Sequence, residues 1–136
     1  MKNKILKSDE NMNYSLINIE LNNFKDDDEY NKILKCINNS YDNKKELFLS
    51  IETINLTIES VSVKKVYDFS IFLKNYKKKN IQYLKKTTIK IYNKDIYNIL
   101  YNLFTYVSKP IAHVVVILYN KNNKKENIEL IKDFFP

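Results

Sequence analysis

Apolar residues follow two different periods along this chain, and the two periods alternate. In four short segments they recur at every second position or form an unbroken run, as in β-strands. Between and after these segments they recur at steps of three and four, as on the buried face of a helix. The expected strands are residues 14–21, 46–54, 87–92 and 112–119. The expected helices start near residues 26, 63, 93 and 127.

Residues typical of helix ends support this reading. The acidic run Asp26–Glu29 opens the first expected helix, where carboxylates interact favourably with free N–H groups and with the helix dipole. Asn93 stands where it can cap the third helix, and Pro110 follows its end. The last expected helix carries Ile128, Ile131 and Phe135 on one face.

The run Ala112–Tyr119 is the most hydrophobic part of the chain and is rich in β-branched residues. It predicts a central strand that is covered on both faces. The whole pattern has the order β-α-β-α-β-α-β-α. This order predicts an α/β fold with one small open sheet of about four mainly parallel strands and helices packed on it. Residues 1–13 are polar and aperiodic and are expected to form a flexible arm, and residues 14–136 a single domain.

The chain of 136 residues contains no glycine, and all of its 23 basic residues are lysines. Phosphate-binding loops and the nucleophile elbow of hydrolases need glycine for close approach or positive φ, so these motifs are excluded. A single cysteine, Cys36, and a single histidine, His113, leave no recognisable catalytic or metal-binding motif. His113 is expected to be a structural, hydrogen-bonded residue. We therefore predict neither catalytic residues nor a metal or cofactor.

The net charge is +7, and the densest basic cluster comprises Lys77, Lys78, Lys79, Lys85 and Lys86. This cluster is either a solvated surface or a phosphate-binding patch. Lysine, asparagine, isoleucine and tyrosine are all encoded by A/T-rich codons, so a biased genome explains their abundance. The same bias is found in large DNA viruses. An electrostatic nucleic-acid-binding protein is therefore kept as the alternative function.

The start of the chain lacks the apolar segment of a signal peptide. The longest apolar run, residues 111–119, is about half the length that crosses a bilayer. A lone cysteine fits a reducing compartment. We expect a soluble, cytoplasmic protein without membrane insertion.

The segment 55–63 joins the second expected strand to the second expected helix. In open α/β sheets the functional crevice lies beyond the carboxyl ends of the strands, so this loop is a candidate site. Ser60 or Ser62 either caps the helix or accepts a phosphoryl group that changes a docking surface. The surface from Glu59 to Tyr76 is the expected partner surface, with Glu59, Lys64, Lys65 and Asp68 as candidate contacts.

This loop and the elements around it resemble the STAS domain (sulfate transporter and anti-sigma factor antagonist) over about residues 14–119. The strand Leu47–Ile51 precedes the loop, and Glu59-Ser60 stands where the family has Asp-Ser. The family's glycine is absent, and Val61 separates the two serines. The resemblance implies a non-enzymatic regulatory module that binds a protein partner, sometimes under control of serine phosphorylation. A second copy of the chain is among the partners considered.

Overall fold

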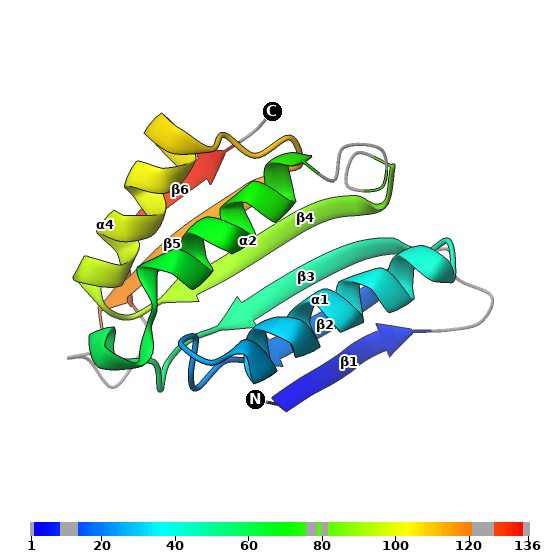
Figure 1. The fold of residues 1–136 in the computed structure, drawn as a ribbon, viewed down its shortest axis with the longest axis horizontal. Coiled ribbons are helices and arrows are strands. Elements are labelled where there is room, and N and C mark those ends of the chain that lie inside the picture. Colours follow the sequence, from blue (N-terminus) through cyan, green and yellow to red (C-terminus); the bar gives the residue numbers. More distant parts are fainter. Residues whose placement is uncertain (1, 9–13, 76–78, 80–81, 121–126, 135–136) are drawn as a thin grey trace.

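The computed structural model describes residues 2–8, 14–75, 79, 82–120 and 127–134 (Figure 1). Three longer helices and six strands alternate for most of the chain. The strands are β1 (Lys2–Ser8), β2 (Tyr14–Glu20), β3 (Glu46–Glu52), β4 (Leu84–Ile91), β5 (Val114–Asn120) and β6 (Asn127–Phe134). The helices are α1 (Asp27–Asp42), α2 (Val63–Asn75) and α4 (Lys94–Asn102), with a short 3-10 turn η1 (Ile58–Ser60) and a π-turn η2 (Leu103–Val107).

The six strands form one sheet in which their spatial order is the same as their order in the chain. The four inner strands β2, β3, β4 and β5 are parallel. The edge strands β1 and β6 are antiparallel to their neighbours. The expectation of an open, mainly parallel α/β sheet with helices packed on it is therefore confirmed.

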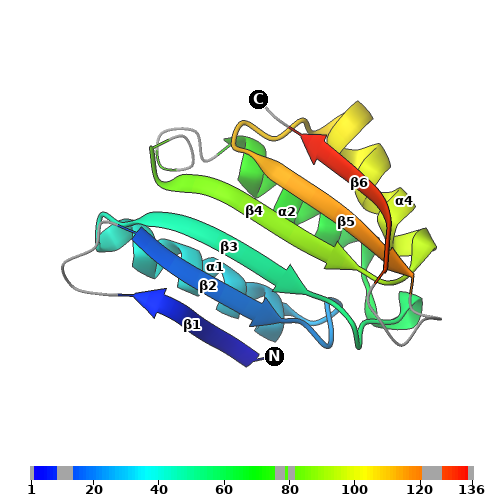
Figure 2. The same ribbon diagram turned by 180° about the vertical axis from the view of Figure 1, so that it is seen from behind.

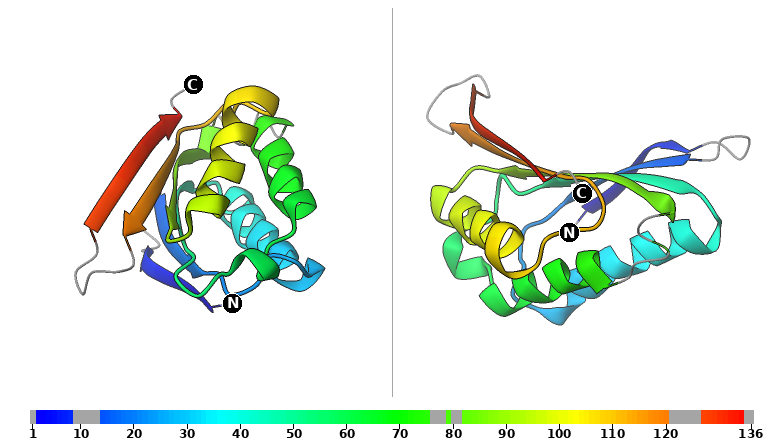
Figure 3. Two further views of the ribbon diagram at one scale, coloured as in Figure 1. Left: turned by 90° about the vertical axis from the view of Figure 1, so that its left-hand side faces the viewer. Right: turned by 90° about the horizontal axis from the view of Figure 1, so that it is seen from above.

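All three longer helices lie on the same face of the sheet, as the view from above in Figure 3 shows. Crossovers between parallel strands are almost always right-handed. When each new strand is added on the same side of the previous one, right-handed crossovers place every helix on one face. Figure 2 looks onto the opposite face, which no described helix or strand covers and which is called the open face below.

Burial along the strands shows this division. In β2 and β3, every second residue is buried in the core, and the residues between are partly or fully exposed. The core lies between the sheet and the helices. Its most deeply buried side chains are Ile19, Ile33, Ile37, Leu47, Leu49, Leu73, Ile91, Phe104, Val114, Val116 and Leu118.

Two terminal segments differ from expectation. Residues Lys2–Ser8 form the edge strand β1 and pair with β2, although they were expected to belong to a flexible arm. Pairing with an edge uses backbone groups, so it needs no apolar periodicity. Residues 9–13 of the expected arm lie outside the described residues.

The expected last helix is wrong, because residues 127–134 form strand β6. The helix was predicted from the spacing of Ile128, Ile131 and Phe135, but Ile128, Leu130 and Phe134 in the same segment fit a period of two. The segment forms a strand and not a helix because the outer edge of β5 has backbone N–H and C=O groups that need partners. Pairing with β6 satisfies these groups. Phe134 is then buried against Phe104, with ring centroids 5.4 Å apart. Phe135, assigned to the same helix, lies outside the described residues.

Strand β5 is an inner strand between β4 and β6, but helices cover only one of its faces. The prediction of a strand covered on both faces is wrong in this respect. Val115 and Tyr119 point to the open face and are nevertheless buried. Tyr92 stacks on Tyr119 with ring centroids 5.2 Å apart, so aromatic side chains provide local cover here.

Two buried threonines provide a stability test on the sheet. Thr53 Oγ1 donates a 2.6 Å hydrogen bond to the Lys90 carbonyl, whereas Thr87 Oγ1 is buried without a partner among the described residues. We expect Thr87→Val to raise the free energy of unfolding by about 1 kcal/mol, because it removes an unsatisfied buried hydroxyl. Thr53→Val should lower it by about 1 kcal/mol. Urea denaturation of both variants checks this, and a loss of stability in Thr87→Val would contradict it.

Candidate partner-binding surface

The loops that follow β2 and β3 are joined to each other by backbone hydrogen bonds. Phe24 N donates to the Ser60 carbonyl at 2.8 Å, and Ser62 N donates to the Phe24 carbonyl at 3.0 Å. Phe24 and Val61 thus form an isolated parallel bridge beyond the sheet. Phe24 itself is buried and packs edge-on against Tyr30 and Phe69. The segment 55–63 is therefore held at the carboxyl end of the sheet, as the sequence predicted.

Ser60 stabilises the η1 turn. Its hydroxyl accepts a hydrogen bond from Thr57 N at 2.9 Å and is also 2.9 Å from the Thr57 carbonyl, to which it donates. These contacts form a reciprocal capping arrangement with Thr57. Modification of Ser60 would therefore disrupt the turn.

Ser62 precedes the first residue of α2. Its Oγ accepts a long hydrogen bond of 3.4 Å from Lys65 N, and its carbonyl accepts one from Val66 N. This is the capping role that the sequence allowed for either serine. Ser62 is partly exposed, and its hydroxyl makes one long hydrogen bond with the described residues, so a group added to it would disturb fewer interactions than one added to Ser60.

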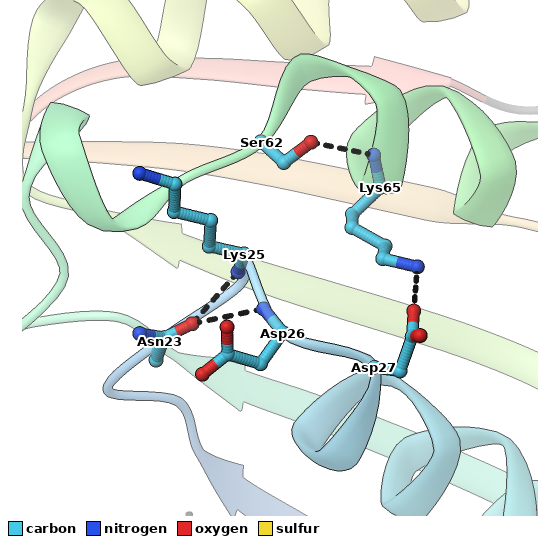
Figure 4. A network of polar contacts seen from close by, with 6 residues as sticks. All are labelled: Asn23, Lys25, Asp26, Asp27, Ser62 and Lys65. Carbon is cyan, nitrogen blue, oxygen red and sulfur yellow. Dashed lines mark hydrogen bonds and ion pairs between the residues drawn. The ribbon is translucent and has the colours of Figure 1, made fainter.

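A polar network connects the starts of α1 and α2 (Figure 4). The Lys65 ammonium group forms an ion pair with the Asp27 carboxylate, and Lys65 also lies over the Tyr30 ring. Asn23 Oδ1 accepts hydrogen bonds from the backbone N–H groups of Lys25 and Asp26, at 2.8 and 3.2 Å. Asp26, Asp27 and Asp28 belong to this helix start, as the acidic run predicted. Lys65, a predicted partner contact, is thereby engaged within the chain.

The ion pair leads to a pH-dependent prediction. Hydrogen bonding and charge attraction from Lys65 lower the pKa of Asp27 below its ordinary value. A carboxyl whose pKa is lower in the folded state stabilises the fold above the unfolded pKa of about 3.9, and this contribution is lost as pH falls through the folded pKa. We expect an NMR titration to give Asp27 a pKa below that value. Lys65→Met should return it toward 3.9. An unchanged pKa in that variant would contradict the pairing.

The predicted contacts Glu59 and Lys64 are exposed, and Asp68 is partly exposed on the next turn of α2. The sequence reading missed three large apolar side chains beside them. Ile58 is 38% exposed, Val63 57% and Tyr67 42%. Val63 and Tyr67 are four residues apart and so lie on one side of α2. Ile58, Glu59, Val63, Lys64 and Tyr67 together are called the α2 surface below.

A helical projection of the sequence contained a signal for this surface. The buried face of α2 is set by Val66, Phe69 and Leu73. At 100° per residue, Tyr67 points about 100° away from this face. An apolar side chain that lies outside the core-facing side of a helix contacts either solvent or a binding partner.

The basic cluster is divided by the limits of the described chain. Lys77 and Lys78 lie outside the described residues, and Lys79 is helical and partly exposed. Lys85 and Lys86 are exposed at the start of β4. Lys86 is the cross-strand neighbour of Phe48 on the open face. Glu46 lies close to the same place, beside Tyr14, Leu16 and Phe48, in a hollow of about 370 Å³.

The two other candidate reactive residues, His113 and Cys36, make contacts that stabilise the fold. His113 Nε2 lies 2.5 Å from Asp133 Oδ1 and links the start of β5 to β6. Cys36 is partly buried on α1 and packs against the core. Within the described ranges, no three His, Cys, Asp or Glu side chains come together as metal ligands. A cavity of about 40 Å³ beneath the loops is lined almost wholly by apolar core residues such as Leu56, Phe69 and Ile96.

Fold and site together describe an α/β protein with one helical layer, one uncovered sheet face and an exposed apolar strip at the start of α2. Comparison with protein-family models, with curated proteins and with solved structures gave no significant match. Among the residues that the structure describes, no helix is both long and apolar enough to span a bilayer.

Proposed function

We propose that this protein is a non-enzymatic protein-interaction module of STAS-like form whose partner binds the α2 surface. The observation that carries this proposal is the exposure of Ile58, Val63 and Tyr67 in one region. Grouped apolar side chains within a polar rim are typical of protein interfaces. Glu59 and Lys64 provide this rim and would give the contact its specificity.

The likeness to STAS domains is supported by the order of the inner elements, which is β2, α1, β3, α2, β4, α4 and β5. This is the order of strands and helices that the resemblance implies. The Glu59-Ser60 pair lies in the η1 turn, directly before α2. Partner binding at the start of α2 therefore agrees with the place of the family's motif.

Serine phosphorylation is a proposed switch of this surface, and the surroundings favour Ser62 over Ser60. A phosphoryl group on Ser62 would stand at the N-terminus of α2, where the helix dipole favours negative charge. Lys64 and Lys65 follow Ser62 after one intervening residue, Val63. The Ser60 hydroxyl is instead needed by the η1 turn.

The test measures partner affinity with a matched pair of double variants. The tagged full chain is used to isolate a partner, and the purified pair is then measured by calorimetry. Val63→Ser with Tyr67→Ser should weaken binding by about 30-fold or more, since apolar hot spots contribute about 1–2 kcal/mol each. Ser62→Glu should shift the affinity, while Ser60→Glu should lower the melting temperature.

The control replaces another exposed valine and tyrosine. Val107 and Tyr106 are 52% and 76% exposed in the η2 turn. Val107→Ser with Tyr106→Ser should leave the affinity unchanged. Loss of binding in this control, with full binding in the α2 double variant, would place the interface elsewhere and overturn the proposal.

The alternative function, nucleic-acid binding, is supported by the exposed Lys85 and Lys86 beside the aromatic Phe48. Glu46, in the same hollow, reduces the attraction of this region for phosphate. A nucleic-acid binder would lose affinity steeply with added salt. That dependence, removed by Lys85→Glu with Lys86→Glu, would favour the alternative.

A further inference from the structure

The open face lies opposite the helices and carries large apolar side chains without a covering layer. Phe48, near the start of β3, is 37% exposed, and Tyr14 packs edge-on against it with ring centroids 6.2 Å apart. Leu16 lies beside both and is partly exposed. An apolar sheet face is normally buried against a second layer. Among the described residues, such a layer lies only on the other side of the sheet.

Opposite charges flank the seam between β3 and β4 on the open face. The strands β2 and β3 carry Glu20, Glu46 and Glu52, and β4 carries Lys86 and Lys90. The carboxylates of β2 and β3 thus lie on one side of the seam between β3 and β4, and the lysines of β4 lie on the other. Toward the edges of the sheet the charges are mixed, since Lys2 of β1 pairs with Glu20 and Asp133 of β6 pairs with Val115. Glu52 and Lys90 face each other across this seam as cross-strand neighbours.

We propose that the open face binds a second copy of this chain, with the two sheets packed face to face about a two-fold axis along the seam between β3 and β4. A half turn about this axis lays β3 of one copy over β4 of the other. Each Glu52 then lies opposite Lys90 of the second copy. Phe48 lies over the side chain of Lys86 of the second copy, where an aromatic face attracts an ammonium group. Between these two contacts, Ser50 lies opposite Thr88 of the second copy, and both side chains are small.

The carboxylates differ in how well the single copy satisfies them. Glu20 Oε1 accepts a hydrogen bond from Asn55 Nδ2 at 3.3 Å. Glu52 Oε1 accepts none from the described residues, although the atom is enclosed by protein. An under-satisfied carboxylate gains from a nearby cation. Glu52 as a whole is only partly buried, so Lys90 of the second copy would attract this carboxylate through its charge without contacting Oε1.

The size of the face is sufficient for a stable pair. Six strands at a spacing of about 4.8 Å and seven residues at about 3.3 Å give roughly 670 Å² per copy, near the ~800 Å² of a standard interface. The carboxylates of Glu46 and Glu52 beside the seam favour a second copy over a nucleic acid, because they repel phosphate. Charge also argues against pairing of two copies along the outer edge of β6. A two-fold antiparallel pairing with Ile131 opposite Ile131 of the second copy would place Glu129 opposite Asp133, and these two carboxylates would repel each other.

The experiment mixes two charge-reversed chains. In Lys90→Glu, residue 90 and Glu52 of the second copy repel each other, and in Glu52→Lys the lysines do so. We expect sedimentation equilibrium to show a wild-type dimer and a dissociation constant at least about 100-fold weaker for each variant alone, since two-fold symmetry doubles each repulsion. An equimolar mixture of both variants should form a heterodimer of near wild-type affinity. Its intermolecular pairs are restored, while the repulsion within each chain remains.

Controls separate this interface from the α2 surface. Lys32→Glu reverses an exposed charge on α1 and should leave the dimer intact. Val63→Ser with Tyr67→Ser should do the same, so failure of the proposed function leaves this result unaffected. A monomeric wild type at about 100 μM, far above the Kd of a standard interface, would overturn the proposal. So would a mixture that stays monomeric, variants that stay dimeric, or binding of an oligonucleotide that protects the open face.

Discussion

Truncation of the chain after Asn120 is expected to abolish stable folding. The truncated protein loses β6, the neighbour that satisfies the outer backbone groups of β5. It also loses Phe134, which packs on Phe104 and Tyr101. The exposed edge would then be the β-branched run Val114–Tyr119, a segment of the kind that pairs with other chains and aggregates. Solubility after expression, and circular dichroism of any soluble material, measure this.

Deletion of residues 1–13 is the matched control, because it removes the opposite edge strand, β1. The newly exposed edge, β2, contains polar residues at Ser15, Asn18 and Glu20 and is less prone to aggregate. We expect this variant to remain soluble and folded. A soluble, cooperatively folding protein truncated after Asn120 would show that β6 is dispensable and would contradict the structure at that edge.

Phe104→Ala is expected to lower the free energy of unfolding by about 3–5 kcal/mol, which is a large part of the stability of a domain of this size. Phe104 is fully buried in the η2 turn and contacts Phe134 of β6. Removal of its ring leaves a cavity where the end of α4 meets the sheet. The measurement is urea denaturation followed by circular dichroism.

Tyr106→Ala is the control for this experiment. Tyr106 belongs to the same η2 turn but is exposed. Its replacement should change the free energy of unfolding by no more than about 0.5 kcal/mol. Equal losses in both variants would mean that the turn itself, rather than packing of Phe104, is responsible.

The inner part of the fold could be predicted from residue patterns. In β2, Ile17 and Ile19 alternate with polar residues, and both are buried. In α4, Ile96 and Leu100 recur at helical spacing, and Asn93 caps the helix through its Oδ1. Such patterns are informative because each element must place its own apolar face toward the core. The terminal strands could not be predicted in this way, since β1 and β6 form by pairing with edges that the sequence does not display.

The sequence predicted where the candidate site lies, but not how its side chains interact. The segment 55–63 lies beyond β3, as alternation of strands and helices requires. The separate roles of Ser60 and Ser62 depend on hydrogen bonds to Thr57 and Lys65, which residue types alone did not assign. The pairing of Lys65 with Asp27 joins residues 38 positions apart. Contacts of this range follow from how loops are placed in space.

The sequence by itself determined the class of fold, because the alternation of two apolar periods leaves few other ways to bury the same side chains. It also determined that glycine-dependent phosphate loops are absent. Only the tertiary structure decided that all three longer helices share one face of the sheet, because this follows from the spatial order of the strands. That order leaves Phe48, Glu52 and Lys90 on a face that no described helix covers, and the apolar run of β5 gave no sign that one of its faces lacks a helical layer.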